Sequence, residues 1–243
     1  MLFNNISFIL HQPQLSENIG ACARAIKNFN FKKLVIVKPK PIYPNDKIFA
    51  TSVGAKDIII SSKVHETLES AVKKVDFVIA ASARFRNKNI KHIKLDDLNT
   101  IDFSKKIAFL FGSEASGLSN NEISYANYTM QIPSNPEFKS LNLSHSVIII
   151  AHAVANIIKL KGAKYFKSNK ISLASKKDIQ AMTNLCIKKL EEKNFFKPIE
   201  KRPIMLENLR SIFYKMELSE KEIRILSSVF ASLAKKVDWQ NHE

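Results

Sequence analysis

The chain has 243 residues, a formal charge of +16 from 38 Lys and Arg against 22 Asp and Glu, and 45% hydrophobic residues. This length and apolar content allow one large domain or two modest ones with a real core, and exclude a disordered chain or a small disulfide scaffold. The positive charge favours a polyanionic partner, because basic side chains release counterions from phosphates. Lysine far outnumbers arginine, so compositional drift toward lysine explains part of the same charge.

Secretion, membrane insertion and metal binding are not indicated. The N-terminus lacks the basic and apolar regions of a signal peptide. The most apolar run, 147–160, is interrupted by His152 and Asn156 and is too short to cross a bilayer. Cys22 and Cys186 have no neighbours that would complete a zinc site, and both lie on apolar helical faces. We therefore expect a cytoplasmic protein with reduced cysteines in its core and no metal.

Strands and helices are predicted to alternate along the first two thirds of the chain. Short apolar segments predict strands at 6–10, 33–37, 58–61, 76–81, 106–111 and 128–132. Apolar residues at helical spacing predict helices at 18–29, 49–55, 64–75 and 147–160. Ser119 with Glu122 predicts a capping box at the start of another helix. The alternation predicts an α/β domain over residues 1–162, a mostly parallel sheet with helices on both faces.

The remainder of the chain is predicted to be helical. Apolar density falls over 163–174, where lysines cluster, which indicates a linker. Three helices are predicted beyond it, at about 175–195, 204–216 and 219–237, and Ser175 and Ser219 begin capping boxes. Residues 175–243 are therefore predicted to be a small all-α C-terminal domain.

A stiff polar loop joins the strand predicted at 128–132 to the helix predicted at 147–160. Pro133 and Pro136 fix their own φ angles and bias the preceding residues toward extended backbone, so neither helix nor strand continues through the loop. A loop held between two buried elements is a good place for a ligand. An ordinary strand-to-helix connection explains the same pattern.

Three other segments combine polar side chains with small residues that leave the main chain accessible. At helical spacing Arg24 falls opposite the apolar face of its helix, one turn from Gly20, where a ligand could approach. A solvated surface arginine explains that pattern equally. The segment 82–86 fits either a ligand-binding edge or an exposed turn, and the loop 112–118 holds two glycines around Glu114. No Gly-x-Gly-x-x-Gly or Walker loop follows a strand, so the usual nucleotide-binding loops are absent from the sequence.

Three motifs occur in order along the first domain. They are Asn18-Ile19-Gly20 with Ala23-Arg24-Ala25, then Phe111-Gly112-Ser113-Glu114 with Gly117-Leu118, then Ile132-Pro133 with Ser140-Leu141-Asn142-Leu143-Ser144. This order resembles the SpoU branch of the knotted SPOUT RNA methyltransferases. Two further features look like the TrmJ subfamily: Asn135-Pro136-Glu137-Phe138 before Ser140-Leu141-Asn142-Leu143, and a helical tail with Asn208-Leu209-Arg210 and Ile225-Leu226. Its members methylate the ribose 2′-hydroxyl of tRNA in the anticodon loop, at nucleotide 32.

The resemblance implies a homodimer whose α/β domain carries a deep C-terminal trefoil knot, an exception to the rule that chains are unknotted. It also implies that S-adenosylmethionine binds in the knot, bent, mainly through main-chain groups and at the subunit interface. The implied cofactor-binding residues are Ala81, Ser82, Ala83, Gly112, Ile132, Lys139, Ser140 and Leu141. The chain departs from some relatives at Ser113, where they carry Arg, and at Ala81, where they carry Thr.

The same resemblance assigns catalytic residues. Arg24 matches the catalytic arginine, Ser140 and Asn142 match positions that line the reacting centre, and Glu114 and Asn18 are expected to support the loop and Arg24. A guanidinium carries donors only and stays protonated, so we expect Arg24 to bind the adjacent phosphate and stabilise alkoxide character rather than to act as a base.

Two other functions stay open from the sequence. The chain could be an RNA-binding protein that has kept the fold without the chemistry, or a methyltransferase of another tRNA or rRNA nucleotide. The basic tail, with Lys188, Lys189, Arg202, Arg210 and Lys215, could grip tRNA or could stabilise the dimer.

Overall fold

A single parallel sheet organises the N-terminal part of the molecule. The computed structural model describes residues 2–83, 90–161 and 173–233. Within these residues the sheet has seven strands in the order β3-β2-β1-β6-β4-β7-β5, and all neighbouring strands are parallel. The strands are β1 (Ile6–His11), β2 (Lys33–Val37), β3 (Lys63–His65), β4 (Phe77–Ala81), β5 (Lys91–Lys94), β6 (Ile107–Phe111) and β7 (Tyr128–Gln131). The predicted α/β fold is thus confirmed, while passage of the chain through a knot stays a prediction.

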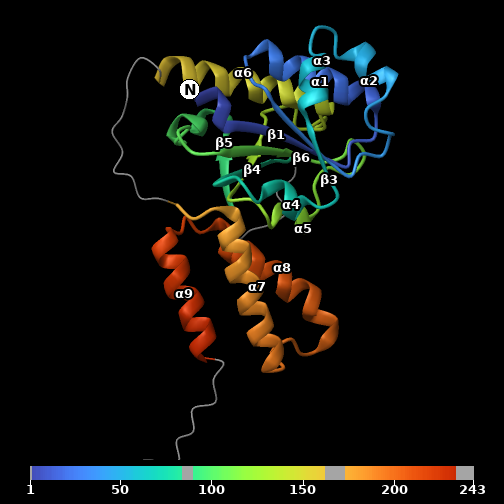
Figure 1. Cartoon of the computed structure of the whole chain (residues 1–243). Helices are drawn as coiled ribbons and strands as arrows, with labels where there is room; N and C mark the ends of the chain where they lie inside the picture. Colours follow the sequence, from blue (N-terminus) through green and yellow to red (C-terminus); the bar gives the residue numbers. More distant parts are fainter. Residues whose placement is uncertain (1, 84–89, 162–172, 234–243) are drawn as a thin grey trace, which may run out of the picture.

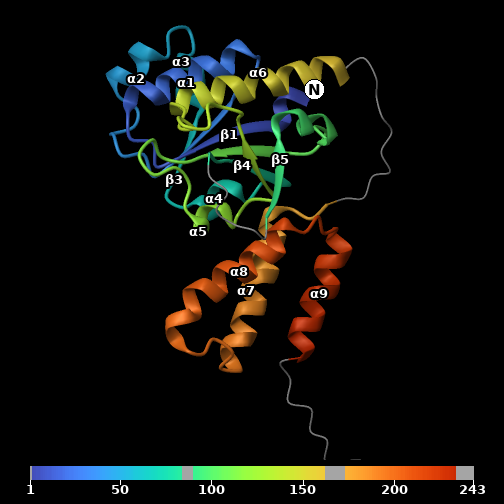
Figure 2. The ribbon, with the colours of Figure 1, turned by 180° about the vertical axis from the view of Figure 1, so that it is seen from behind.

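Helices cover both faces of the sheet (Figures 1 and 2). One face carries α1 (Ser16–Asn28), α2 (Asp46–Thr51), α3 (Lys56–Ser61) and α6 (Leu143–Lys161), and the other carries α4 (Leu68–Val72) and α5 (Asn120–Ile123). Side chains of the central strands alternate between two cores: Phe8 and Phe109 pack on the first face, and Ile9 and Leu110 pack on the second. The central strands are buried on both sides, as expected for a parallel sheet between two helical layers.

Three of the predicted elements between β2 and β4 are wrong in type or extent. Residues 58–61, predicted as a strand, belong to helix α3, and β3 follows it as a short edge strand. The helix predicted at 49–55 begins earlier, since the Asn45 side chain accepts the Ile48 N–H at 3.0 Å and caps α2. The helix predicted at 64–75 is reduced to α4, which Thr67 caps. In α2 and α4 a capping side chain, rather than apolar periodicity, sets where the helix begins, whereas α3 has no side-chain cap.

Strand β5 and the 3₁₀ helix Leu95–Thr100 were not predicted. The sequence of β5, Lys-His-Ile-Lys, carries one apolar residue, and this edge strand pairs only with β7 among the described strands. Such a short edge strand needs an apolar side chain on one face only, and a single apolar residue is too few to show the alternation by which a strand is predicted from sequence.

The C-terminal helices form a separate cluster on the α5 side of the sheet (Figure 1). They are α7 (Lys176–Glu192), α8 (Arg202–Lys215) and α9 (Glu220–Leu233), with a 3₁₀ turn at Ile199–Lys201. Capping boxes at Ser175 with Asp178 and at Ser219 with Glu222 open α7 and α9, as predicted. Most of the linker predicted at 163–174 lies outside the described residues, and the division into two domains stays a prediction.

Arg210 and Lys176 attach these helices to the sheet domain. The Arg210 guanidinium donates to Asn121 at 2.8 Å and lies 4.9 Å from the centre of the Tyr125 ring. Lys176 is fully buried, and its Nζ donates to the main-chain carbonyl of Tyr214 at 2.9 Å. The Lys176 N–H also donates to the carbonyl of Val75 at 3.0 Å, so this residue bonds to both parts of the molecule.

Lys176 should make the stability of this junction depend on pH. Burial lowers its pKa from 10.5 to about 7, against the attraction of Asp76 and Glu217. Between those two pH values the unfolded chain holds a proton that the folded chain lacks, so stability should rise as pH rises. We expect the melting temperature of the wild type to rise relative to that of Lys176→Met by roughly 3–10 °C between pH 7 and pH 9.5. Parallel melting curves of the two proteins across this range would contradict the assignment.

No helix within the described ranges is long and apolar enough to cross a membrane. Cys22 and Cys186 are free and buried in their two cores, as predicted.

Candidate active site

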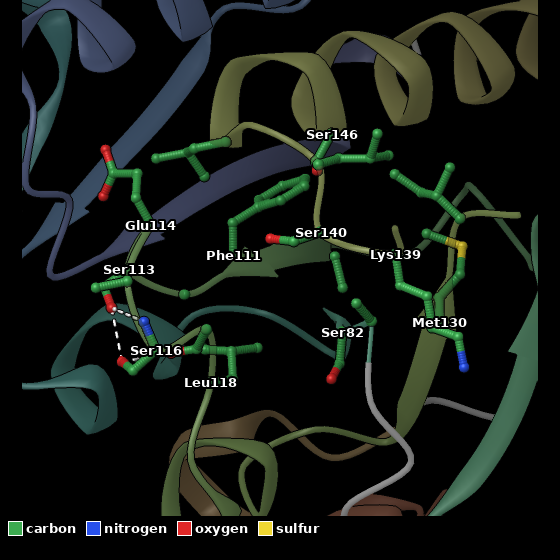
Figure 3. Close-up of a pocket in the computed structure, with 18 residues that line it drawn as sticks. Ser82, Phe111, Ser113, Glu114, Ser116, Leu118, Met130, Lys139, Ser140 and Ser146 are labelled. Atoms are coloured by element: carbon green, nitrogen blue, oxygen red, sulfur yellow. Dashed lines mark hydrogen bonds between the residues drawn. The ribbon is translucent and has the colours of Figure 1, made fainter. Parts of the chain in front are cut away.

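A cavity of about 280 Å³ opens at the carboxyl ends of β4, β6 and β7 (Figure 3). In parallel α/β sheets this edge is where ligands bind, close to the point where the strand order reverses. Its lining residues come from these strand ends, from the loop after β6, and from the loop and first turn leading into α6. They are Ala81, Ser82, Ala83, Phe111, Gly112, Ser113, Glu114, Ala115, Ser116, Gly117, Leu118, Met130, Ile132, Lys139, Ser140, Leu141, Leu143 and Ser146.

The structure brings together all of the predicted cofactor residues around this cavity. Ala81, Ser82 and Ala83 lie at and just after the end of β4. Gly112 follows β6, and Ile132 follows β7. Lys139, Ser140 and Leu141 come from the loop before α6. Residues 84–86, named with them as a candidate edge, lie outside the described residues. That these groups bind the cofactor stays a prediction.

Gly112 is required by the way the loop after β6 folds back. A Cβ at Gly112 would lie 2.3 Å from the Gly117 carbonyl carbon and 2.5 Å from the Leu118 nitrogen, both main-chain atoms. Gly117 closes this turn with φ of +66°, and its N–H donates to the Ser113 carbonyl at 2.9 Å. The loop is therefore a tight ring of main chain against one wall of the cavity.

Ser113 has a structural role in the same turn. Its side chain is 6% exposed, its Oγ lies 2.8 Å from the Ser116 Oγ, and it accepts the Ser116 N–H at 3.3 Å. Figure 3 shows these two contacts as dashed lines. The small hydroxyl of Ser113 thus holds the turn closed.

A relay of hydrogen bonds joins the three sequence motifs. Glu114 accepts the main-chain N–H groups of Gln14 at 2.8 Å and Leu15 at 3.3 Å, and the Asn18 amide at 2.8 Å. The Asn18 amide oxygen in turn accepts from the Asn142 side chain at 3.0 Å. Asn18 is buried, while Glu114 is half-buried and Asn142 is exposed. The chain fixes geometry mainly at Asn18, where a lost partner would leave a buried polar group unsatisfied. The predicted support by Glu114 is present, but Asn18 contacts Asn142 rather than Arg24.

Asn142 also caps α6. Its Oδ1 accepts the N–H and the hydroxyl of Ser144, each at 2.8 Å, and its carbonyl accepts the Ser146 N–H at 3.0 Å. This capping explains why α6 begins at Leu143 and not at residue 147, where the apolar run starts. It also explains how Ser146, which the sequence analysis missed, comes to line the cavity: it lies in the first turn of the helix.

Arg24 lies away from this cavity in the single chain. It is exposed, it does not line the cavity, and within the described residues it makes no hydrogen bond or ion pair. The hypothesis that a ligand approaches the bare backbone at Gly20 is wrong. A Cβ on Gly20 would lie 2.4 Å from the carbonyl oxygen of Ile48, so helix α2 itself occupies that space.

Several basic residues proposed as a tRNA grip already have partners. Arg202 pairs with Glu191, and Lys189 pairs with Glu192 at 2.8 Å. Together with the docking contacts of Arg210, these pairs favour a structural role for part of the tail. Surface ion pairs of this kind contribute little stability, so they leave the charge available to a stronger anion.

The lining fits a compact cofactor held by main chain. The cavity is at the lower end of the size range of small-molecule sites, and Glu114 and Lys139 are its only ionisable lining side chains among the described residues. Small residues at the ends of β4 and β6 leave main-chain edges accessible, and Phe111, Met130 and Ile132 supply apolar surface. No group of His, Cys, Asp and Glu within the described part of the chain could hold a metal ion.

Comparison with known proteins gives consistent results. The profile of the SpoU rRNA Methylase family matches residues 5–152. The tRNA (cytidine-2'-O-)-methyltransferase TrmJ of Methanocaldococcus jannaschii is 33% identical over 93% of this chain and 98% of its own length. The tRNA (cytidine/uridine-2'-O-)-methyltransferase TrmJ of Pectobacterium atrosepticum is 28% identical over 98% of this chain and all of its own length.

Solved structures agree with the sequence matches. The crystal structure of TrmJ from Z. mobilis ZM4 superposes with a TM-score of 0.84 at 29% identity, covering 94% of this chain and 99% of that chain. Because the family profile spans more than half of the chain and one relative exceeds 30% identity over nearly all of it, the chain belongs to the SpoU rRNA methylase family and is an S-adenosylmethionine-dependent RNA 2′-O-methyltransferase.

Proposed function

We propose that this enzyme methylates the ribose 2′-hydroxyl of a cytidine or uridine in tRNA, at nucleotide 32 of the anticodon loop, in the cytoplasm. The observation that carries the proposal is the Glu114–Asn18–Asn142 relay, which gathers three distant motifs around one cavity. The relatives that match over nearly the full length are named as tRNA methyltransferases of this type. The formal charge of +16 suits a tRNA substrate.

The cavity residues would hold the cofactor and aim it. S-adenosylmethionine supplies a methyl group on a sulfonium centre, which must lie in line with the attacking oxygen. Main-chain groups at Ala81 to Ala83, Gly112 and Ile132 would hold the cofactor from the strand ends. Lys139, Ser140 and Leu141 would enclose it from the loop before α6.

The residues around the ribose would orient it and stabilise charge. Ser140, which lines the cavity, would bind a ribose hydroxyl, while Asn142 holds the first turn of α6 and Asn18 in place. Arg24 would bind the phosphate beside the target ribose and stabilise negative charge on the 2′-oxygen as the proton leaves to water or to that phosphate. A guanidinium has no lone pair with which to take the proton itself.

We further propose that a homodimer completes the site. Arg24 is exposed and outside the cavity of its own chain, so a second copy related by a two-fold axis would have to bring its Arg24 to this cavity. Each of the two sites would then combine the cavity of one copy with the arginine of the other.

The test is incubation of the purified protein with unmodified tRNA transcripts and S-adenosylmethionine labelled in its methyl group, followed by nucleoside mass spectrometry. We expect label in 2′-O-methylcytidine or 2′-O-methyluridine, and loss of the label when nucleotide 32 is replaced by its 2′-deoxy form. Label that persists in the 2′-deoxy substrate would place the target at another nucleotide. In a parallel incubation with rRNA, label in rRNA and none in tRNA would overturn the choice of tRNA.

A further inference from the structure

Phe138 is a large apolar side chain left in solvent beside the cavity. It is 76% exposed, whereas Phe8 and Phe109 in the same domain are fully buried. The next two residues, Lys139 and Ser140, line the cavity, but Phe138 is not among the lining residues. The ring is therefore on the outside of the loop and is accessible to a substrate rather than to the cofactor.

The main chain under this ring is held in a fixed turn. Asn135 accepts the Glu137 N–H through its side chain and the Phe138 N–H through its carbonyl, each at 3.0 Å. Pro136 restricts φ within the turn, and the Ser134 hydroxyl donates to the Lys139 carbonyl at 3.3 Å. A surface that is ordered before binding loses little conformational entropy when a ligand covers it.

Chain geometry puts Phe138 within reach of the nucleotide at the reacting position or of its neighbour. Phe138 and Ser140 are two positions apart in the chain, with Lys139 between them, so their Cα atoms lie at most about 7 Å apart. Successive nucleotides of a strand in a duplex are about 3.4 Å apart along its axis. An RNA that presents a ribose to Ser140 therefore carries the base of that nucleotide, or of its neighbour, within reach of the ring.

We propose that Phe138 is a stacking platform for a nucleobase, either that of the methylated nucleotide or that of the next one. This inference rests on the proposed function, because it takes the ligand of the ring to be a base in an unpaired RNA loop. Every base has a π-face, so stacking on an aromatic ring tolerates different bases. Glu137 and Lys139, the neighbours of Phe138 in the sequence, carry opposite charges and add no net charge to this segment.

The test measures binding of a fluorescently labelled anticodon stem-loop to the full-length protein by anisotropy, with S-adenosylhomocysteine present. For Phe138→Ala we expect the dissociation constant to rise about 5- to 100-fold, the range that loss of one stacked base implies. Phe138→Tyr should bind within about threefold of the wild type, whereas Phe138→Leu should bind nearly as weakly as Phe138→Ala, because it lacks a π-face. The slope of affinity against salt should not change, because no phosphate contact is lost.

Ile60 offers a matched control, since it is 75% exposed on α3. Ile60→Ala should leave RNA affinity unchanged, and Phe138→Ala should keep the wild-type affinity for S-adenosylmethionine in calorimetry. Full RNA affinity in Phe138→Ala or in Phe138→Leu would overturn the platform. So would dissociation of a dimer by Phe138→Ala in sedimentation, because the ring would then be covered by a second copy.

Failure of this inference and failure of the proposed function give different results. If the wild type methylates tRNA and Phe138→Ala binds as well as the wild type, the function stands and the platform is wrong. If the wild type binds the stem-loop but transfers no methyl group, and Phe138→Ala loses affinity, the platform stands and the function is wrong.

Discussion

Arg24→Ala is expected to reduce methyl transfer to tRNA at least about 100-fold, the effect of losing a group that stabilises charge in the transition state. The affinity for S-adenosylmethionine should stay close to that of the wild type, because Arg24 does not line the cavity. Single-turnover assays would measure the rate, and calorimetry would measure cofactor affinity. Arg24→Lys should recover little activity, since an ammonium lacks the planar fork that binds a phosphate through two donors.

A mixing experiment tests whether Arg24 acts on the cavity of a second copy. Arg24→Ala and Asn142→Ala are each expected to be inactive alone. If each site combines Arg24 of one copy with Asn142 of the other, a heterodimer of the two variants has one intact site. Refolding them together at equal amounts should therefore restore roughly a quarter of the wild-type sites, by random pairing of copies into closed two-fold dimers.

The control is a mixture of each variant with a copy that carries both substitutions, which can form no intact site. A mixture of the single variants that stays inactive, from chains shown to exchange by sedimentation, would mean that Arg24 serves its own cavity. Loss of cofactor binding in Arg24→Ala would instead make Arg24 a structural residue.

Gly112→Ala is expected to abolish detectable binding of S-adenosylmethionine. The added Cβ would lie within 2.5 Å of three main-chain atoms of Gly117 and Leu118, and no side-chain rotation relieves such a contact. The loop after β6 would have to move, and the wall of the cavity would move with it. Calorimetry should show at least a 100-fold weaker affinity, since the site depends on a closely fitted arrangement of main-chain groups.

A second glycine separates this effect from a general loss of stability. Gly54 has φ of +75° with nothing within 4 Å of an added Cβ, and it does not line the cavity. Gly54→Ala should lower stability by about 1–2 kcal/mol through backbone strain and should leave cofactor affinity unchanged. Normal cofactor binding by a folded Gly112→Ala protein would exclude this loop as part of the site.

The strands inside the sheet could be predicted from the sequence, whereas the two edge strands and the extents of the short helices α2 and α4 could not. β1, β2, β4, β6 and β7 lie within a residue or so of their predicted ranges, because buried parallel strands are continuous apolar runs. Residues 58–61 carry a run of three isoleucines but form part of a helix, since so short an apolar run fits either structure and tertiary packing decides. The boundaries of α2, α4 and α6 depend on Asn45, Thr67 and Asn142 as caps.

Part of the candidate site could likewise be predicted from the sequence, and part could not. The motifs predicted which residues lie around the cavity, because main-chain loops at strand ends need glycine and proline at fixed places. Ser146 and Met130 were missed, since a residue reaches the cavity from a helix turn or a strand end without a sequence signature of its own. The contact of Asn18 with Asn142 joins residues 124 positions apart, and one sequence without relatives holds no signal for such a pair.

The place of β6 has a consequence for how the chain matures on the ribosome. This strand lies between β1 and β4, although it is made after both. Until residues 107–111 leave the ribosome, β1 and β4 each have an unpaired hydrophobic edge, because β6 is the strand that pairs with both. Nascent chains arrested before that point should be captured by chaperones or should aggregate, and chains arrested beyond it should become resistant to protease.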